Sequence, residues 1–292
     1  AMEFELGPLL DAATGAELAR FGTPGPGVVV ELPDAPLAVV LHPGDDRVTF
    51  VHSGLSVVDH GDHADLIEGR PYVLQTVNLG PRPSQAHALG DDLAVFHEGD
   101  GTVAWLDRRL LGVSLDFVFL DGRAPGPGAV AVVGDHAFVA EAAQGLVDVI
   151  DRAGTSVATF EGCPGAGGPT AWASGVAFGC DDGVLLVEAR ADGTFVSHAL
   201  AVPAGAADGV RVGALFGDEG SATLVGAFGQ GIAVIDPAAR TLAPVALPAA
   251  PVAMRFAETG ARLAVLTADG ALHALDPAGG APQASTARCA SR

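Results

Sequence analysis

The sequence contains no lysine. All 15 of its basic residues are arginines, and they stand against 35 aspartates and glutamates, which gives a formal net charge of −20 at pH 7. A surface with this excess of negative charge repels the phosphates of nucleic acids and of anionic lipids, and it attracts cations. The composition therefore argues against nucleic acid as a partner and favours a cationic one.

Long apolar runs are also missing. Although 49% of the residues are hydrophobic, no uninterrupted apolar stretch reaches the roughly 18 residues that a membrane-spanning helix needs. We expect a soluble mature chain without membrane insertion. No signal peptide is visible, and residues 1–4 are interpreted as a cloning remnant in front of a chain whose leader has been removed.

The motifs of the common enzyme classes are absent as well. The sequence has no G-x-S-x-G turn, no H-E-x-x-H pattern and no phosphate-binding loop. Asp-Asp-Gly stretches such as residues 181–183 lack the acidic spacing of a calcium loop and are typical of hairpin turns. The sequence therefore predicts a protein that is not an enzyme.

Cysteine is scarce: Cys163, Cys180 and Cys289 are the only three. Cys163 precedes a predicted inner strand and Cys180 ends the strand after it, so a hairpin would bring this pair together for a disulfide. The alternative is two independent buried thiols. A disulfide persists only in an oxidising compartment, so we expect an exported protein, periplasmic or extracellular. No role is assigned to Cys289.

A repeat dominates the chain. Two apolar residues followed by an acid recur about every 44 residues on average, which is the period of propeller blades. The acids of the seven copies are Asp11, Asp59, Asp107, Asp151, Glu188, Asp236 and Asp276. We expect an all-β fold, a seven-bladed β-propeller that forms one domain over residues 1–292.

Hairpin patterns lie upstream of the acids. Residues 48–51 and 55–58 read as two consecutive strands of one blade, and 40 glycines with 20 prolines mark turns and disfavour helices. The first copy is incomplete, because only ten residues precede Asp11. At the other end, we expect residues 277–292 to supply the last strand of the last blade.

One histidine cluster stands out, at residues 59–65 (Asp-His-Gly-Asp-His-Ala-Asp). Imidazole nitrogens and carboxylate oxygens are zinc ligands, and Gly61 lets the loop fold so that both rings converge. We predict a metal site with His60, Asp62 and His63. Two histidines hold zinc weakly, and the candidates for a further ligand are His42, His52, His87, His97 and His136. The alternative is a polar loop that bonds only its own backbone.

Three segments carry a resemblance to a known family. They are Leu-Asp-Ala-Ala-Thr-Gly-Ala-Glu at residues 10–17, the histidine cluster with Leu66, and Cys163-Pro164 followed by residues 176–186. In these segments the chain resembles the AztD-type zinc chaperones, seven-bladed periplasmic propellers that deliver zinc to the solute-binding protein of a zinc ABC transporter. The chain departs from the family pattern at Gly167 and Pro169, where the family has a histidine and a glutamate.

The resemblance implies a ligand set and a function. It implies the Cys163–Cys180 bridge and zinc as the bound metal, and it places a family histidine near Ser84 or Gln85, so we include the nearby His87 as a ligand. It implies an exported zinc carrier whose partner is the solute-binding protein of a zinc ABC uptake system, and we expect a monomer. The alternative is a metal-free propeller of the cell envelope that binds proteins or other ligands through its loops.

Overall fold

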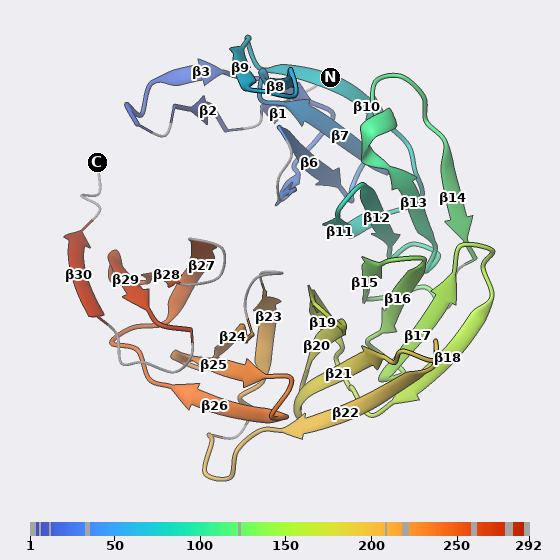
Figure 1. Cartoon of the computed structure of the whole chain (residues 1–292), viewed down its shortest axis with the longest axis vertical. Coiled ribbons are helices and arrows are strands. Elements are labelled where there is room, and N and C mark those ends of the chain that lie inside the picture. Colours follow the sequence, from blue (N-terminus) through green and yellow to red (C-terminus); the bar gives the residue numbers. More distant parts are fainter. Residues whose placement is uncertain are drawn as a thin grey trace. The chain divides into compact units, whose positions relative to one another are not determined.

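The computed structural model describes residues 4–5, 7–11, 13–32, 36–121, 124–207, 209–217, 222–257, 262–277 and 283–288. Within these ranges the fold is made of β-strands, with a single three-residue 3₁₀ helix at Arg108–Leu110 (Figure 1). None of the described segments is a helix that could span a bilayer. The chain divides into two compact units, residues 1–126 with 152–154 and residues 127–151 with 155–292. The single-domain interpretation remains a prediction.

The first unit contains two four-stranded antiparallel sheets and three strand pairs. The first sheet has the order β10-β7-β6-β5 and consists of β5 (Val28–Glu31), β6 (Leu37–His42), β7 (Arg47–His52) and β10 (Tyr72–Val77). The second runs in sequence order through β11 (Pro83–Leu89), β12 (Asp92–His97), β13 (Val103–Asp107) and β14 (Phe117–Leu120). The pairs join β1 (Phe4–Glu5) to β4 (Gly22–Thr23), β2 (Leu9–Leu10) to β3 (Glu17–Ala19), and β8 (Leu55–Asp59) to β9 (Ala64–Glu68).

The second unit contains four more sheets, each of four strands in sequence order. The first two comprise β15 (Gly128–Val133), β16 (His136–Glu141), β17 (Leu146–Asp151), β18 (Ser156–Glu161), and then β19 (Gly167–Trp172), β20 (Gly175–Cys180), β21 (Gly183–Ala189), β22 (Phe195–Ala201). The last two comprise β23 (Val212–Phe216), β24 (Leu224–Phe228), β25 (Gly231–Asp236), β26 (Thr241–Val245), and then β27 (Pro251–Ala257), β28 (Arg262–Thr267), β29 (Ala271–Leu275), β30 (Gln283–Arg288). As expected, the last sheet takes its fourth strand from the C-terminal segment.

The predicted number of blades is wrong for the described part of the chain, which forms six four-stranded sheets rather than seven. The first repeat copy, which ends at Asp11, contributes only the pair β2–β3. Cys289 lies outside the described residues.

Five of the seven repeat copies lie on the third strand of a four-stranded sheet. These strands are β13, β17, β21, β25 and β29. The copy that ends at Asp59 differs, because it lies on β8, and β8 pairs only with β9. The third strand of its sheet is instead β7, which pairs directly with β10. Residues 53–71 are therefore an insertion between two neighbouring strands, and the predicted pairing of residues 48–51 with 55–58 is wrong.

Burial explains why the middle strands are almost entirely apolar. On β6 and β7 four consecutive residues are buried, so side chains on both faces of the strand are covered. On one of these faces the cover comes from the neighbouring sheet of the same unit. In the first unit one cluster joins Val39, Leu41 and Phe50 of one sheet to Leu93, Val95 and Leu106 of the other. Each fully buried side chain of this kind stabilises the fold by about 1.5–3 kcal/mol relative to an exposed one.

A disulfide joins Cys163 to Cys180 in the second unit, and its Cα atoms are 4.9 Å apart. Cys180 ends β20, and Cys163 lies four residues before β19, so the β19–β20 hairpin brings the two sulfurs together, as predicted. Both side chains are buried among the apolar residues that join the β15–β18 and β19–β22 sheets. A bridge in this position is shielded from reductants while the protein is folded.

Replacing both cysteines should lower the free energy of unfolding. The chain-entropy model assigns about 3 kcal/mol to a bridge that closes a loop of this size, so we expect a loss of that order in the Cys163→Ala/Cys180→Ala variant. Urea unfolding followed by circular dichroism measures it. A thiol reductant present during unfolding should destabilise the parent and leave the variant unchanged; equal stability of the two proteins without reductant would contradict the expectation.

Candidate metal centre

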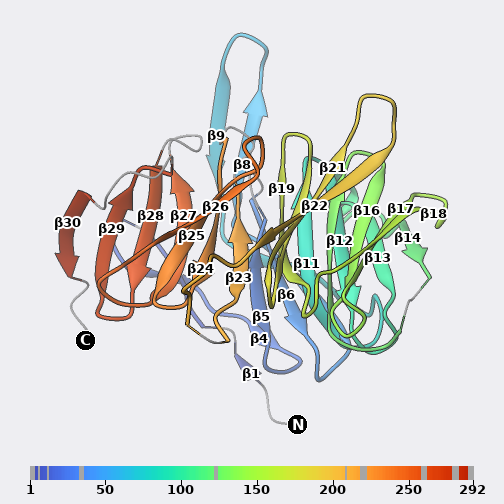
Figure 2. The same cartoon turned by 90° about the horizontal axis from the view of Figure 1, so that it is seen from below.

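The histidine cluster lies at the tip of the β8–β9 hairpin. Gly54 and Gly69 close the base of this hairpin. The N–H of Gly69 donates to the carbonyl oxygen of Gly54 (2.8 Å). Gly54 has a positive φ of 84°, and a Cβ atom there would lie 2.4 Å from the Gly69 oxygen, so only glycine fits. Figure 2 shows the hairpin projecting beyond the ends of the other strands of the first unit. The tip is therefore held away from the core.

The turn between the strands is a two-residue loop. His60 donates its N–H to the carbonyl oxygen of His63 (2.9 Å), which leaves Gly61 and Asp62 as the loop residues. Gly61 has a positive φ of 88°, as a tight hairpin loop with glycine at its first position requires. The N–H of Gly61 donates to Oδ1 of Asp59 (2.7 Å). Because of this turn, His60 and His63 stand opposite each other, and their rings stack with centroids 5.0 Å apart.

Asp65 joins the two histidines. It follows His63 by two residues, and alternate residues of a strand share a face. Its Oδ2 lies 3.4 Å from Nε2 of His60 and 3.9 Å from Nε2 of His63. All three donor atoms fall within 4.8 Å of one another, and zinc bonds of 2.0–2.2 Å in tetrahedral geometry separate donors by roughly 3.3 Å. We call His60, His63 and Asp65 the donor cluster.

Asp62 lies beside the donor cluster rather than in it. Its Oδ1 is 2.7 Å from Nδ1 of His63. An ionised carboxylate only accepts hydrogen bonds, so Nδ1 carries the proton and Nε2 keeps a lone pair that faces Asp65. Metal-binding histidines commonly donate their second nitrogen to a carboxylate in this way. Asp62, predicted as a ligand, is therefore placed to orient His63.

His87, the fourth predicted ligand, lies on β11 and pairs in register with Ala94. It is not a member of the donor cluster. Burial of its imidazole lowers the pKa of His87 to about 4, because the charged form loses its hydration. His87 is half-buried rather than a core residue, and its imidazole is neutral at pH 7.

Two of the other histidines proposed as further ligands, His42 and His97, are buried and contact other residues of the first unit. His42 is buried, with Nδ1 3.0 Å from the carbonyl oxygen of Gly25 and Nε2 3.0 Å from Oγ1 of Thr49. His97 is also buried, with Nδ1 3.2 Å from Oγ1 of Thr102, and burial lowers the pKa of His97. Both rings are therefore part of the core of the first unit.

His52 and His136 contact aromatic rings instead. The ring of His52 stacks on Tyr72 at 5.0 Å, and its Nδ1 accepts the N–H of Gly54 at the base of the hairpin (2.9 Å). His136 meets Phe195 edge to face at 5.0 Å. Neither belongs to a group of three or more metal-type donors in the part of the chain that the structure describes.

The sequence prediction missed Asp65 as a donor. The sequence contained the information needed to identify Asp65. If Gly61 and Asp62 form a two-residue loop, the alternation of side chains along the two strands places residues 60, 63 and 65 on one face. The sequence instead predicted a further ligand from another blade, because two histidines alone hold zinc weakly. The positions at which the chain departs from the family, Gly167 and Pro169, both lie on β19.

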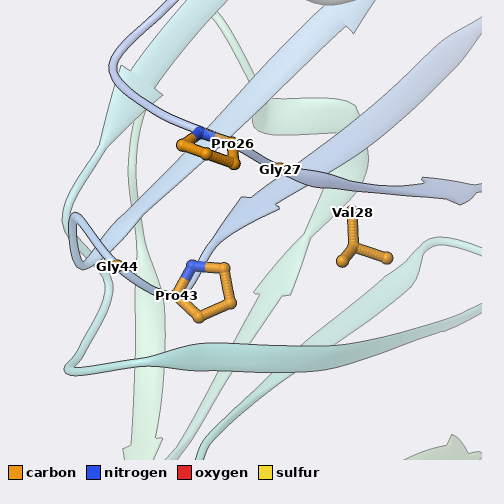
Figure 3. Close-up of a pocket in the computed structure, with 5 residues that line it drawn as sticks. All are labelled: Pro26, Gly27, Val28, Pro43 and Gly44. Atoms are coloured by element: carbon orange, nitrogen blue, oxygen red, sulfur yellow. The ribbon is translucent and has the colours of Figure 1, made fainter. Parts of the chain in front are cut away.

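A second concave feature lies elsewhere in the first unit. It is a hollow of about 290 Å³ lined by Pro26, Gly27, Val28, Pro43 and Gly44. Figure 3 shows the two proline rings and the Val28 side chain around it. The five residues that line it offer no charged or metal-binding side chain.

The low pKa of His87 predicts a pH dependence of stability. The unfolded chain takes up this proton near the ordinary value of 6.5 and the folded chain only near 4, so the unfolded state binds more protons between these values. The contribution of neutral His87 is complete above pH 6.5 and is lost as the pH falls towards 4, by roughly 1–3 kcal/mol. We expect the free energy of unfolding to decline less between pH 6.5 and pH 4 in His87→Gln than in the parent. Urea unfolding at these two pH values measures it. An identical decline in parent and variant would contradict this assignment.

Comparison with known proteins agrees with the sequence resemblance. The chain is 24% identical over 241 residues to the zinc chaperone AztD of Citrobacter koseri, an alignment that covers 78% of this chain and 56% of that protein. The chain thus spans about half the length of this curated relative. No protein-family model matches the chain.

Solved structures show the fold. The crystal structure of Citrobacter koseri AztD superposes with a TM-score of 0.83 at 22% identity, and its apo form with a TM-score of 0.81, each over 96% of this chain and 78% of the other. The predicted all-β propeller is therefore confirmed, with six four-stranded sheets in the described residues. The sequence match confirms the predicted resemblance to the AztD-type zinc chaperones.

Proposed function

We propose that the chain is a zinc carrier that holds its cargo at the tip of the β8–β9 hairpin. The observation that supports this most is the donor cluster itself. Two imidazole nitrogens and one carboxylate oxygen lie within 4.8 Å of one another, and Asp62 orients one of the imidazoles. These are the donor types and the kind of supporting hydrogen bond that zinc sites use.

The site is suited to exchange rather than to permanent binding. Zinc takes four ligands in a closed structural site, whereas three protein donors leave one position for water or for a donor from another protein. The side chains of His60, His63 and Asp65 are 47%, 59% and 61% exposed, so an acceptor can reach the ion. A zinc ion bound in this way can be passed on to another protein.

The charge of the protein supports the same role. A net charge of −20 raises the local concentration of cations and repels phosphates. Asp59 near the donor cluster and Glu68 at the base of the hairpin extend the negative potential along it. The field therefore favours capture of a divalent cation at this tip.

The relative and the disulfide support the cellular setting. A relative named a zinc chaperone suggests a non-enzymatic part in zinc uptake, and a buried disulfide suits the periplasm or the cell exterior. We propose that the acceptor is the solute-binding protein of a zinc ABC uptake system and that the carrier acts as a monomer.

Removing both histidines should abolish zinc binding. After treatment with a chelator, we expect calorimetric titration at neutral pH to give one zinc ion per chain with micromolar or tighter affinity in the parent, and no such binding in His60→Ala/His63→Ala. The matched control is His136→Ala/His198→Ala, which loses two histidines outside the cluster and should bind as the parent does. Absence of binding by the parent would refute the carrier and favour a metal-free interaction propeller.

Asp62 should affect zinc affinity without being a ligand. In Asp62→Asn the amide no longer holds the proton on Nδ1 of His63, so we expect zinc affinity to fall by roughly 10–100-fold, the usual effect of losing such a partner. Asp65→Asn removes a donor and should weaken binding at least as much. The exposed Asp116→Asn serves as a charge-matched control, and an affinity for Asp62→Asn equal to that of this control would show that the orientation of His63 is unimportant.

A further inference from the structure

The β8–β9 hairpin keeps large apolar side chains in water. Every residue of both strands is exposed, because the two strands pair only with each other and pack on no sheet. The exposed fractions are 42% for Leu55, 70% for Val57 and 59% for Leu66. Single exposed apolar residues are common, whereas adjacent ones on a protruding element mark an interaction site.

These three residues share one face. Val57 stands directly opposite Leu66, and Leu55 precedes Val57 by two residues on the same strand. Asp65 pairs with Val58 and therefore faces the other way. We call Leu55, Val57 and Leu66 the apolar face, which lies on the side of the hairpin opposite the donor cluster.

Acids border the apolar face at both ends. Asp59 pairs with Ala64 towards the tip, and Glu68 pairs with Leu55 at the base, all on this face. Residues 55–68 contain no arginine and no lysine. An apolar centre with a charged rim is the usual composition of a protein interface, and this rim requires arginine or lysine on the other side.

We propose that the apolar face is the docking surface for the protein that accepts zinc, a partner with an apolar patch bordered by basic residues. This inference rests on the proposed function for the identity of the acceptor. Charge decides among the occupants, because a second copy of this chain would bring the same acids and a net charge of −20, and an anionic membrane would also be repelled. The hairpin projects from its unit (Figure 2), and all residues of its two strands are exposed.

Docking on this face leaves the metal ligands free. The partner lies against one side of a two-stranded hairpin while His60, His63 and Asp65 hold the ion on the other side and at the tip. Docking and metal binding are therefore separable by mutation. Variants of the apolar face should keep zinc and lose the acceptor, whereas variants of the donor cluster should lose zinc and keep the acceptor.

The test measures binding of the full chain to the purified solute-binding protein of the zinc ABC system from the same cells, by biolayer interferometry. We expect Val57→Ser/Leu66→Ser to raise Kd by at least about 10-fold, as for central interface residues, with unchanged zinc stoichiometry. Val113→Ser is the matched control, because Val113 is 85% exposed outside the hairpin, and it should bind like the parent. The Glu68→Arg variant should also weaken binding, since it places a positive charge against a basic rim.

The outcomes distinguish docking from metal binding. Parent-like binding by both Val57→Ser/Leu66→Ser and Glu68→Arg, or no binding by the parent, overturns the docking surface even if zinc is bound. Self-association of the parent in sedimentation velocity that these substitutions abolish assigns the face to a second copy and also overturns the proposal. If the parent binds no zinc and yet loses the acceptor through these substitutions, the docking surface stands and the carrier function fails. Circular dichroism confirms that each variant is folded.

Discussion

The structure depends on one constraint, which is that a four-stranded sheet with two apolar faces is stable only when other sheets cover both. The middle strands β6 and β7 show this directly, with four consecutive buried residues each. Within each unit, apolar clusters extend from one sheet to the next. Stability is thus a property of neighbouring sheets together, as in other repeat architectures.

The β8–β9 hairpin is the place where this constraint does not apply. It leaves the first sheet between β7 and β10, is closed at its base by Gly54 and Gly69, and has both faces in solvent. Because no core surrounds the tip, charged and metal-binding side chains occur there without a desolvation penalty. The same exposure lets one face carry the donors beside Val58 and Ile67, while the other carries Leu55, Val57 and Leu66.

The candidate site could be predicted in part. The sequence indicated His60 and His63 because histidines spaced around a glycine suggest converging ligands, and in the structure the two rings stack across the short loop. The roles of Asp62 and Asp65 depended on which carboxylate faced which ring, and spacing alone does not specify this. His87 was chosen for its closeness to a family position, and its strand carries it into the first unit instead.

The sequence by itself determined the all-β class, the repeat of about 44 residues and the position of the histidine cluster, and its hairpin spacing favoured the pairing of Cys163 with Cys180. These features follow from local periodicity. Only the tertiary structure decided that residues 55–68 leave their sheet and that the first copy forms no four-stranded sheet. Both outcomes depend on which strands pair. The sequence does not specify the pairing, because strands with the same apolar pattern are equally suitable partners for one another. Contacts with neighbouring sheets select among these pairings.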